Sequence, residues 1–332
     1  MSDINLEDTA LLTSHIKEYW HQQITPYASN LGDISESVGL IGFCCDAGVK
    51  RNNGRVGASQ GPTAFRDHMR KVACHNTLSS TIDFGDIVVI DDQLEAGQKE
   101  LSVLVAKQVQ QVKRLLVIGG GHETAYGTFC GLHEALGADC KIGIINLDAH
   151  FDLRQPGDAG ASSGTPFYQI QALTGPDNFY YFCMGLARES NTQILFDRAD
   201  EWGVMYRTDS QMKHSDLDQI KRELQSFAQS CDALYLTIDM DVLPHYQAPG
   251  VSAPAVRGVD LDVIESVIDQ VIDCAQYCRF GLPVVELTEL NPNHDPQGVT
   301  ARTAAFLANR MLKSATVPIN FSAQNSKQKE RI

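Results

Sequence analysis

Short runs of apolar residues recur along the chain and alternate with longer segments in which apolar residues are spaced three or four positions apart. The short runs predict buried strands, and the periodic segments predict helices packed on them. The predicted strands lie within residues 38–43, 82–90, 114–118, 142–145, 179–185, 203–206, 233–238 and 283–287. The predicted helices begin near residues 61 and 124 and cover residues 94–112, 217–227, 261–278 and 300–312.

Strands and helices alternate over nearly the whole length, which predicts one parallel sheet covered by helices on both faces. We therefore expect an α/β fold, a single three-layer α/β/α domain that spans residues 1–332. No linker, shift in composition or internal repeat divides the chain. Residues 1–35 are predicted to form a peripheral segment with a helix and a connecting loop, and residues 322–332 a polar tail.

The composition argues against several classes of protein. With 332 residues, of which 43% are hydrophobic and 20% charged, the chain can bury a large core. A net charge of −14 argues against a nucleic-acid partner and against binding to an anionic membrane surface. No apolar run reaches the roughly 18 residues of a membrane span, and residues 1–20 lack the pattern of a signal peptide. The expected partner is a small molecule.

The cysteines indicate a reducing compartment. There are nine, an odd number, and they are scattered without a CxxC pair. Cysteines in apolar runs, such as Cys44 and Cys45, behave as small buried hydrophobic residues. We therefore expect most of them to be reduced thiols in a cytoplasmic protein.

Residues 146–154, Asn-Leu-Asp-Ala-His-Phe-Asp-Leu-Arg, carry the first candidate chemistry. They follow a predicted strand, and Asp148, His150 and Asp152 lie at positions i, i+2 and i+4. An extended backbone points these three side chains to one side. Two carboxylates and an imidazole that converge in this way indicate a metal site. A polar loop with helix-capping aspartates is the alternative.

Four further polar side chains occupy the same place relative to other predicted strands. His122 follows the strand at 114–118 and three glycines. Asp239 and Asp241 follow a later strand, and Glu289 follows the last one. The carboxyl ends of parallel strands share one edge of an open sheet, where ligands bind. We therefore expect all these carboxylates and imidazoles to gather in one crevice.

Carboxylates crowded in one crevice repel each other and retain protons unless cations neutralise them. The four aspartates would carry about −4, which matches two divalent ions. The donors are oxygen and nitrogen without a thiolate, which favours a hard metal such as manganese over a structural zinc. Magnesium suits carboxylates but is less suited to two imidazoles. Two such ions can share a bridging water and lower its pKa toward neutrality, which creates a hydroxide nucleophile.

These segments resemble motifs of the ureohydrolase superfamily, which includes arginases, agmatinases and formimidoylglutamases. The matching sequences are Gly-Gly-Gly-His at 119–122, Asp-Ala-His-Phe-Asp at 148–152, Ile-Asp-Met-Asp at 238–241 and Glu-Leu-Asn-Pro at 289–292. They follow the family's order, and the resemblance covers residues 38–312. It implies an arginase-like fold, two Mn²⁺ ions per subunit and a homo-oligomer.

The resemblance also implies roles for individual residues. One manganese ion would be held by His122, Asp148, Asp152 and Asp239. The other would be held by Asp148, His150, Asp239 and Asp241, so that two aspartates are shared. Asp152 would also accept a hydrogen bond from the hydroxide. Glu289 would pair with the substrate's amidine or guanidine group, because a carboxylate accepts paired N–H bonds from a planar cation.

Departures from the arginase pattern bear on the substrate. Ser163 stands where arginases have a histidine, and Arg154 stands where they have an asparagine that reaches the substrate's carboxylate. Arg188 falls near the acidic residues that hold the substrate's α-amino group in arginases. Arginines in these places repel an ammonium group and attract carboxylates. For Arg51 and Arg55, in the glycine-rich loop after the first strand, carboxylate binding and a solvated surface role are equally open.

The sequences Asp-Ala-His-Phe-Asp-Leu-Arg and Ser-Ser-Gly-Thr-Pro-Phe resemble the formimidoylglutamase branch, whose members act in histidine breakdown. The predicted function is therefore a binuclear manganese hydrolase that converts N-formimidoyl-L-glutamate and water to L-glutamate and formamide. Asp152 and Glu289 are its predicted catalytic residues. A guanidino-acid hydrolase that releases urea is the alternative among enzymes. A catalytically silent homologue that binds a metal or ligand is the alternative outside them.

Overall fold

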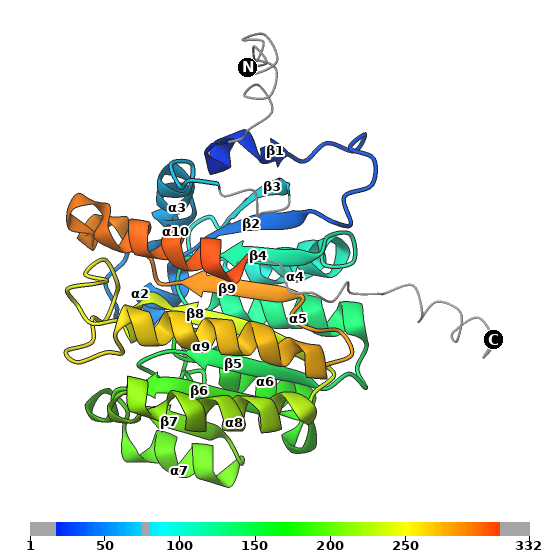
Figure 1. The fold of residues 1–332 in the computed structure, drawn as a ribbon. Coiled ribbons are helices and arrows are strands. Elements are labelled where there is room, and N and C mark those ends of the chain that lie inside the picture. The colour runs from blue at the N-terminus through cyan, green and yellow to red at the C-terminus, as the bar shows by residue number, and fades with distance from the viewer. Residues whose placement is uncertain (1–17, 75–79, 313–332) are drawn as a thin grey trace, which may run out of the picture.

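A computed structural model describes residues 18–74 and 80–312. A sheet of nine parallel strands runs through this part of the chain, in the order β1-β3-β2-β4-β9-β8-β5-β6-β7 (Figure 1). The strands are β1 (Ile24–Pro26), β2 (Val38–Cys44), β3 (Thr81–Val88), β4 (Arg114–Ile118), β5 (Ile142–Leu147), β6 (Tyr180–Leu186), β7 (Met205–Thr208), β8 (Ala233–Asp239) and β9 (Val284–Thr288). The prediction of one α/β domain with a central parallel sheet is confirmed.

Each predicted strand agrees with an observed one to within two residues at either end. The largest shift is at β7, which begins two residues later than predicted. The sequence prediction lacks β1, because this edge strand has three residues, two of them exposed, and so no apolar run. A short 3₁₀ helix, Trp20–Gln22, precedes β1. The predicted tail at 322–332 lies outside the described residues.

Helices cover both faces of the sheet (Figure 1). They are α2 (Ala47–Arg51), α3 (Gly61–Met69), α4 (Leu94–Gln108), α5 (Thr124–Leu136), α6 (Pro166–Thr174), α7 (Gln193–Glu201), α8 (Leu217–Gln229), α9 (Leu261–Cys274) and α10 (Val299–Met311). The prediction omits α2, α6 and α7, and the segment read there as one long loop after the first strand contains α2. The predicted helix at 261–278 is too long, because a 3₁₀ turn, Ala275–Tyr277, follows α9.

The sheet separates two hydrophobic cores. Buried residues of α3, α8, α9 and α10 pack on one face, and buried residues of α4, α5, α6 and α7 pack on the other. Side chains alternate between these cores along a strand, as the period of two requires. On β8, Leu234 and Leu236 enter the first core, whereas Tyr235 enters the second. Every residue of β8 is therefore buried.

The order of the strands determines where the polar motifs meet. The strands β4, β9, β8 and β5 are neighbours in the middle of the sheet, and all of them are parallel. The segments that follow their carboxyl ends are the four that carry the predicted ligands and Glu289. Because these ends share one edge, the fold itself brings the four segments together.

The cysteines and the helix lengths agree with the expectations from composition. Apart from Cys74, the cysteines are free thiols, and five of them are buried, as expected for core thiols. Burial raises the pKa of Cys231 to about 12, so this thiol stays protonated near neutral pH. Among residues 18–74 and 80–312, no helix has both the length and the apolar character that crossing a bilayer requires.

Candidate metal centre and substrate pocket

The first group of polar side chains surrounds the imidazole of His122. Its Nδ1 atom lies close to three carboxylate oxygens. The distance is 3.0 Å to Oδ2 of Asp148, 3.0 Å to Oδ2 of Asp152 and 3.3 Å to Oδ2 of Asp239. The ligand atoms of these four residues lie within 4.8 Å of one another. Nδ1 is buried and makes no hydrogen bond of normal geometry with them. A nitrogen that faces three carboxylates in this way fits a metal ion between them.

The second group shares one carboxylate with the first. His150 Nδ1 lies 3.1 Å from Asp241 Oδ2 and 3.6 Å from Asp148 Oδ1. Asp148, His150 and Asp241 form this second group, whereas Asp239 belongs to the first group only. One oxygen of Asp239 accepts the backbone N–H of Asp241 at 2.8 Å. The shared use of Asp148 agrees with the predicted bridge, and the second bridge through Asp239 stays a prediction.

The electrostatics of the two groups also fit cations. Burial, followed by repulsion from Asp241 and Asp148, raises the pKa of Asp239 well above its ordinary value. Burial, followed by the charge of Asp148, raises the pKa of Asp152 to about 6. Without cations these carboxylates therefore hold protons more readily than exposed ones. Divalent ions bound to oxygen and nitrogen would stabilise the ionised carboxylates, as manganese does in sites of this composition.

Unusual backbone conformations position both residues predicted to be catalytic. Asp152 has φ +50° and Glu289 has φ +64°, in the left-handed region that few residues other than glycine adopt. Each such residue costs about 1–3 kcal/mol, and it persists only where the surroundings hold it. The backbone N–H of Glu289 donates to the carbonyl of Gly120 at 2.7 Å, which ties this turn to the loop before His122.

Glu289 presents one carboxylate oxygen without a partner. Its Oε1 accepts the backbone N–H of His122 at 3.1 Å, while its buried Oε2 has no hydrogen bond within the described part of the chain. Burial, followed by the charge of Asp239, raises the pKa of Glu289 well above its ordinary value. A cationic ligand that donates N–H groups to Oε2 would satisfy the free oxygen and favour the ionised carboxylate.

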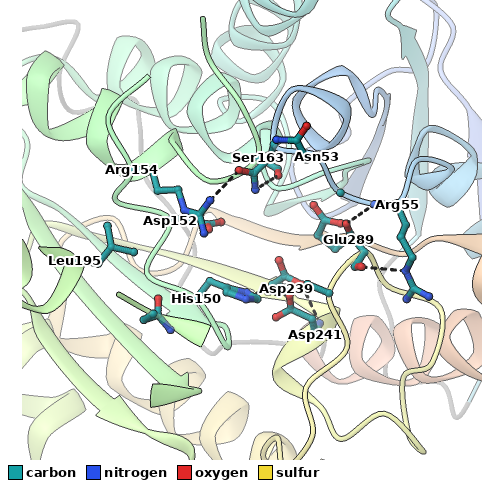
Figure 2. Close-up of a pocket in the computed structure, with 15 residues that line it drawn as sticks. Asn53, Arg55, His150, Asp152, Arg154, Ser163, Leu195, Asp239, Asp241 and Glu289 are labelled. Carbon is teal, nitrogen blue, oxygen red and sulfur yellow. Dashed lines mark hydrogen bonds and ion pairs between the residues drawn. The ribbon is translucent and has the colours of Figure 1, made fainter. Parts of the chain in front are cut away.

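These groups open into a cavity of about 270 Å³ (Figure 2). Residues from three of the four predicted motif segments line it, together with residues of the loop after β2 and the loop after β8, whereas the segment that carries His122 does not reach it. The lining residues are Asn52, Asn53, Gly54, Arg55, His150, Asp152, Arg154, Ser163, Asn191, Leu195, Asp239, Asp241, Ser252, Ala253 and Glu289. The cavity therefore joins the carboxylate groups to a wall that carries positive charge.

Arg154 supplies part of that charge. Its Nη1 donates to Asn52 Oδ1 at 3.2 Å, and Asn52 Nδ2 donates to Ser163 Oγ at 3.2 Å. The guanidinium group of Arg154 is exposed and keeps donors free for an anionic ligand. Asn52 is absent from the sequence prediction, although its glycine-rich loop is recognised there as a place for binding groups.

The other three arginines considered for carboxylate binding, Arg51, Arg55 and Arg188, differ in their surroundings. Arg188 is exposed and does not line the cavity, because its guanidinium lies over the Phe196 ring, 5.3 Å from the centroid. Arg51 pairs with two acidic side chains, donates to two backbone carbonyls and does not line the cavity. Arg55 lines the cavity, and its Nε donates to the carbonyl of Ser252 at 3.0 Å.

Asn191 supports the site, although the sequence analysis does not predict it. Asn191 accepts the backbone N–H of Phe151 at 3.0 Å and donates to the carbonyls of Ala149 and Ala187, each at 2.9 Å. It therefore fixes the backbone that carries His150 and lines the cavity beside it. Its sequence context is an ordinary polar turn, so no pattern distinguishes it.

The comparisons with known proteins bear directly on this site. The family model described as the arginase family matches residues 36–313. The chain belongs to the arginase family. The resemblance found in the motifs is thereby confirmed, and the matched range contains all four motif segments.

Arginase-family relatives resemble the chain over most of its length. The formimidoylglutamase of Chromobacterium violaceum is 43% identical over 291 residues, 87% of this chain and 90% of that protein. The formimidoylglutamase of Aeromonas salmonicida is 42% identical over 296 residues, 89% of this chain and 92% of that protein.

Solved structures support the same fold. The formimidoylglutamase from Bacillus subtilis aligns with a TM-score of 0.76 at 21% identity and covers 92% of this chain and 98% of its own. The Trypanosoma cruzi formiminoglutamase solved with Mn²⁺ aligns with a TM-score of 0.74 at 23% identity, over 85% of this chain and 95% of its own.

Proposed function

We propose that this arginase-family chain is a binuclear manganese hydrolase that converts N-formimidoyl-L-glutamate and water to L-glutamate and formamide. The observation that carries the proposal is the distribution of charge around one cavity. Three aspartates, His150 and Glu289 line the cavity, and Arg154 contributes positive charge to its wall. A substrate with a cationic amidine at one end and carboxylates at the other matches both kinds of charge. The relatives named formimidoylglutamase support this choice of substrate.

The proposed metal ligands are those that the motifs assign. The first ion would be held by His122, Asp148, Asp152 and Asp239, and the second by Asp148, His150, Asp239 and Asp241. When bound, a pair of divalent ions acts as a Lewis acid and makes water nucleophilic near neutral pH. The Trypanosoma cruzi relative solved with Mn²⁺ supports manganese as the metal.

The side chains then orient the reacting groups. Glu289 Oε2 accepts N–H bonds from the amidinium, while the bond from His122 holds Oε1 in place. Asp152 lines the cavity and accepts a hydrogen bond from the attacking water. The water oxygen bonds to the formimidoyl carbon, and the bond from this carbon to the glutamate nitrogen breaks. The nitrogen leaves with a proton as the amine of L-glutamate, and the carbon leaves in formamide.

Arg154 accounts for the preference against arginine as a substrate. Its guanidinium, held by Asn52, pairs with a carboxylate and repels a free ammonium group. Arg55 lies on the same cavity, although backbone carbonyls occupy part of its donor set. N-formimidoyl-L-glutamate has two carboxylates and no free amine, so it suits this wall better than arginine does.

We also propose bounds for the domain, a cellular location and an oligomeric state. The catalytic domain would comprise residues 1–332, with 1–35 peripheral and 322–332 a polar tail. We propose a cytoplasmic homo-oligomer that acts in histidine breakdown. The five buried free thiols support the location, because reduced core cysteines are typical of cytoplasmic proteins. Light scattering on the purified protein measures the oligomeric state.

Product analysis tests the function. Manganese-loaded protein is assayed in parallel on N-formimidoyl-L-glutamate and 4-guanidinobutyrate, with separate detection of glutamate, formamide and urea. We expect glutamate and formamide in equal amounts from the first substrate. If only 4-guanidinobutyrate is turned over and urea is released, the proposed metal site stands, but the substrate is a guanidino acid. Metal binding without turnover of either compound would favour the silent homologue.

The guanidino-acid hydrolase remains the second candidate because of one observation. The unpartnered Oε2 of Glu289 can accept N–H bonds from a guanidinium as well as from an amidinium. A guanidino acid also carries a carboxylate for Arg154. The chemistry at the metal site would be the same, and only the leaving product would differ.

A further inference from the structure

A chain of buried polar groups begins at the ring nitrogen of His122 that does not face the carboxylates, and none of its members lines the cavity. Thr237 of β8 and Glu286 of β9 are paired across the two strands in register. His122 Nε2 lies 3.1 Å from Thr237 Oγ1, and Thr237 Oγ1 lies 3.0 Å from Glu286 Oε1. All three residues are at most 1% exposed. The ring nitrogen that does not face the carboxylates therefore has a partner of its own.

The hydroxyl groups around Glu286 determine the direction of these hydrogen bonds. Tyr235 donates its hydroxyl to Glu286 Oε1 at 2.7 Å, and Thr128 donates to Oε2. With Thr237 as the third donor, the carboxylate accepts from three hydroxyls. A hydroxyl has a single proton, and that of Thr237 is donated to Glu286. Thr237 Oγ1 must then accept from His122.

This direction selects the tautomer of His122. The proton of the neutral ring lies on Nε2, where Thr237 accepts it. Nδ1 is then left with a free lone pair, and it faces Asp148, Asp152 and Asp239. A metal ligand needs this lone pair, and a partner on the other nitrogen keeps both the tautomer and the ring plane in place.

We propose that Thr237 is a positioning residue of the metal centre, which holds His122 in the tautomer and orientation that present Nδ1 to the ion. Glu286 fixes the direction in which the Thr237 hydroxyl donates its proton. This inference rests on the proposed metal site. Side chains in this outer position typically change metal affinity about 10–100-fold when they are removed.

The test compares two substitutions on the same strand. Thr237→Val keeps the shape of the side chain but removes the acceptor for His122, and it also takes one donor from Glu286 Oε1. Tyr235→Phe takes a donor from the same oxygen and leaves the link to His122 intact. Thr237→Ser restores the hydroxyl. Mn²⁺ affinity of each full-length protein is measured by titration calorimetry, and thermal unfolding of the metal-free proteins reports their folding.

We expect Thr237→Val to weaken Mn²⁺ binding about 10–100-fold, and Tyr235→Phe and Thr237→Ser to stay within about threefold of wild type. Wild-type affinity in Thr237→Val would overturn the inference. An equal loss in Tyr235→Phe would also overturn it, because Glu286 would then act without Thr237. If Thr237→Val fails to fold, a Thr237→Ser protein with strongly weakened binding contradicts the proposal, and retained binding supports it. A wild-type protein that binds no Mn²⁺ would instead reject the proposed function.

Discussion

Asp148 lies between the two groups of candidate ligands, and this position distinguishes it from the other aspartates. One of its oxygens faces His122 at 3.0 Å, and the other faces His150 at 3.6 Å. Asp241, by contrast, belongs to the second group only. Loss of Asp148 should therefore disturb both sites, whereas loss of Asp241 should disturb one.

We predict that Asp148→Asn removes tight binding at both sites and that Asp241→Asn leaves one Mn²⁺ bound per chain. An amide keeps the shape of the carboxylate but loses the charge that balances the cation. Metal analysis after equilibrium dialysis measures the content of each protein against wild type. Asp241→Asn with no bound metal, or Asp148→Asn with an unchanged content, would contradict this assignment.

Arg154 is the side chain on which the proposed substrate depends. Its replacement by alanine should raise KM for N-formimidoyl-L-glutamate roughly tenfold, equivalent to about 1.4 kcal/mol, and leave kcat nearly unchanged. The exposure of the guanidinium keeps the effect below that of a buried ion pair. Steady-state kinetics on the dianionic substrate provides the measurement. Arg188→Ala is the control, because this side chain lies on Phe196 and outside the cavity lining.

Single residues differ in how far the sequence reveals them. Apart from His122, the predicted metal ligands follow apolar runs at a spacing of two, and the structure brings all of the ligands together in two groups. Thr237 could be found by the same logic, since it precedes Asp239 by two positions within an apolar strand. Asn52 and Asn191 could not, because short polar residues in turns serve local backbone contacts as often as sites. The substrate-binding role predicted for Arg188 rests only on its position in the chain. That position does not reveal that its guanidinium lies over the ring of Phe196.

At the level of elements, the strands are the most predictable part of the fold. Buried parallel strands need apolar residues on both faces, so they appear as uninterrupted apolar runs such as the one in β4. The missed helices α6 and α7 have nine residues each, and α2 has five. Helices of this length show too few turns to establish a period, and their ends depend on packing that the sequence does not display.

The loop between β4 and α5 shows how closely the elements of the site are packed. A Cβ atom at Gly120 would lie 1.6 Å from the carbonyl oxygen of Cys45. The carbonyl of Gly120 also accepts the backbone N–H of Glu289 at 2.7 Å. Gly120→Ala should therefore push the loop that carries His122 away from Cys45 and disturb its hydrogen bond with Glu289.

We predict that Gly120→Ala lowers stability by at least about 1–3 kcal/mol, the usual cost of forcing extra volume into a packed region. It should also reduce Mn²⁺ affinity. Gly157→Ala is the matched loop control, because a Cβ there meets nothing within 4 Å. Thermal unfolding and metal titration of both variants provide the comparison. Equal behaviour of the two proteins would argue against the close approach at Gly120.

For the molecule as a whole, two buried carboxyl groups, that of Asp152 in the site and that of Glu123 next to His122 in the sequence, make the stability of the metal-free protein depend on pH. Burial is the largest cause that raises the pKa of Asp152 to about 6 and that of Glu123 to about 7. These folded-state values lie above the unfolded values of about 4, so the folded protein binds more protons between them. The stability from these two groups is fully present below about pH 4 and is lost as pH rises through about 6–7.

A bound cation takes the place of the proton on Asp152, and protons compete with it less as pH rises. We therefore predict that Mn²⁺ raises the melting temperature more at about pH 8 than at about pH 6. A free concentration of 100 times Kd stabilises the folded state by about 2.7 kcal/mol. Calorimetric melting at both pH values, once with Mn²⁺ and once with a chelator, measures the increment, which is the rise in melting temperature that Mn²⁺ causes. Asp148→Asn is the control, because it should gain little at either pH. An increment in wild type that shrinks as pH rises would show that the ion binds elsewhere than at these carboxylates.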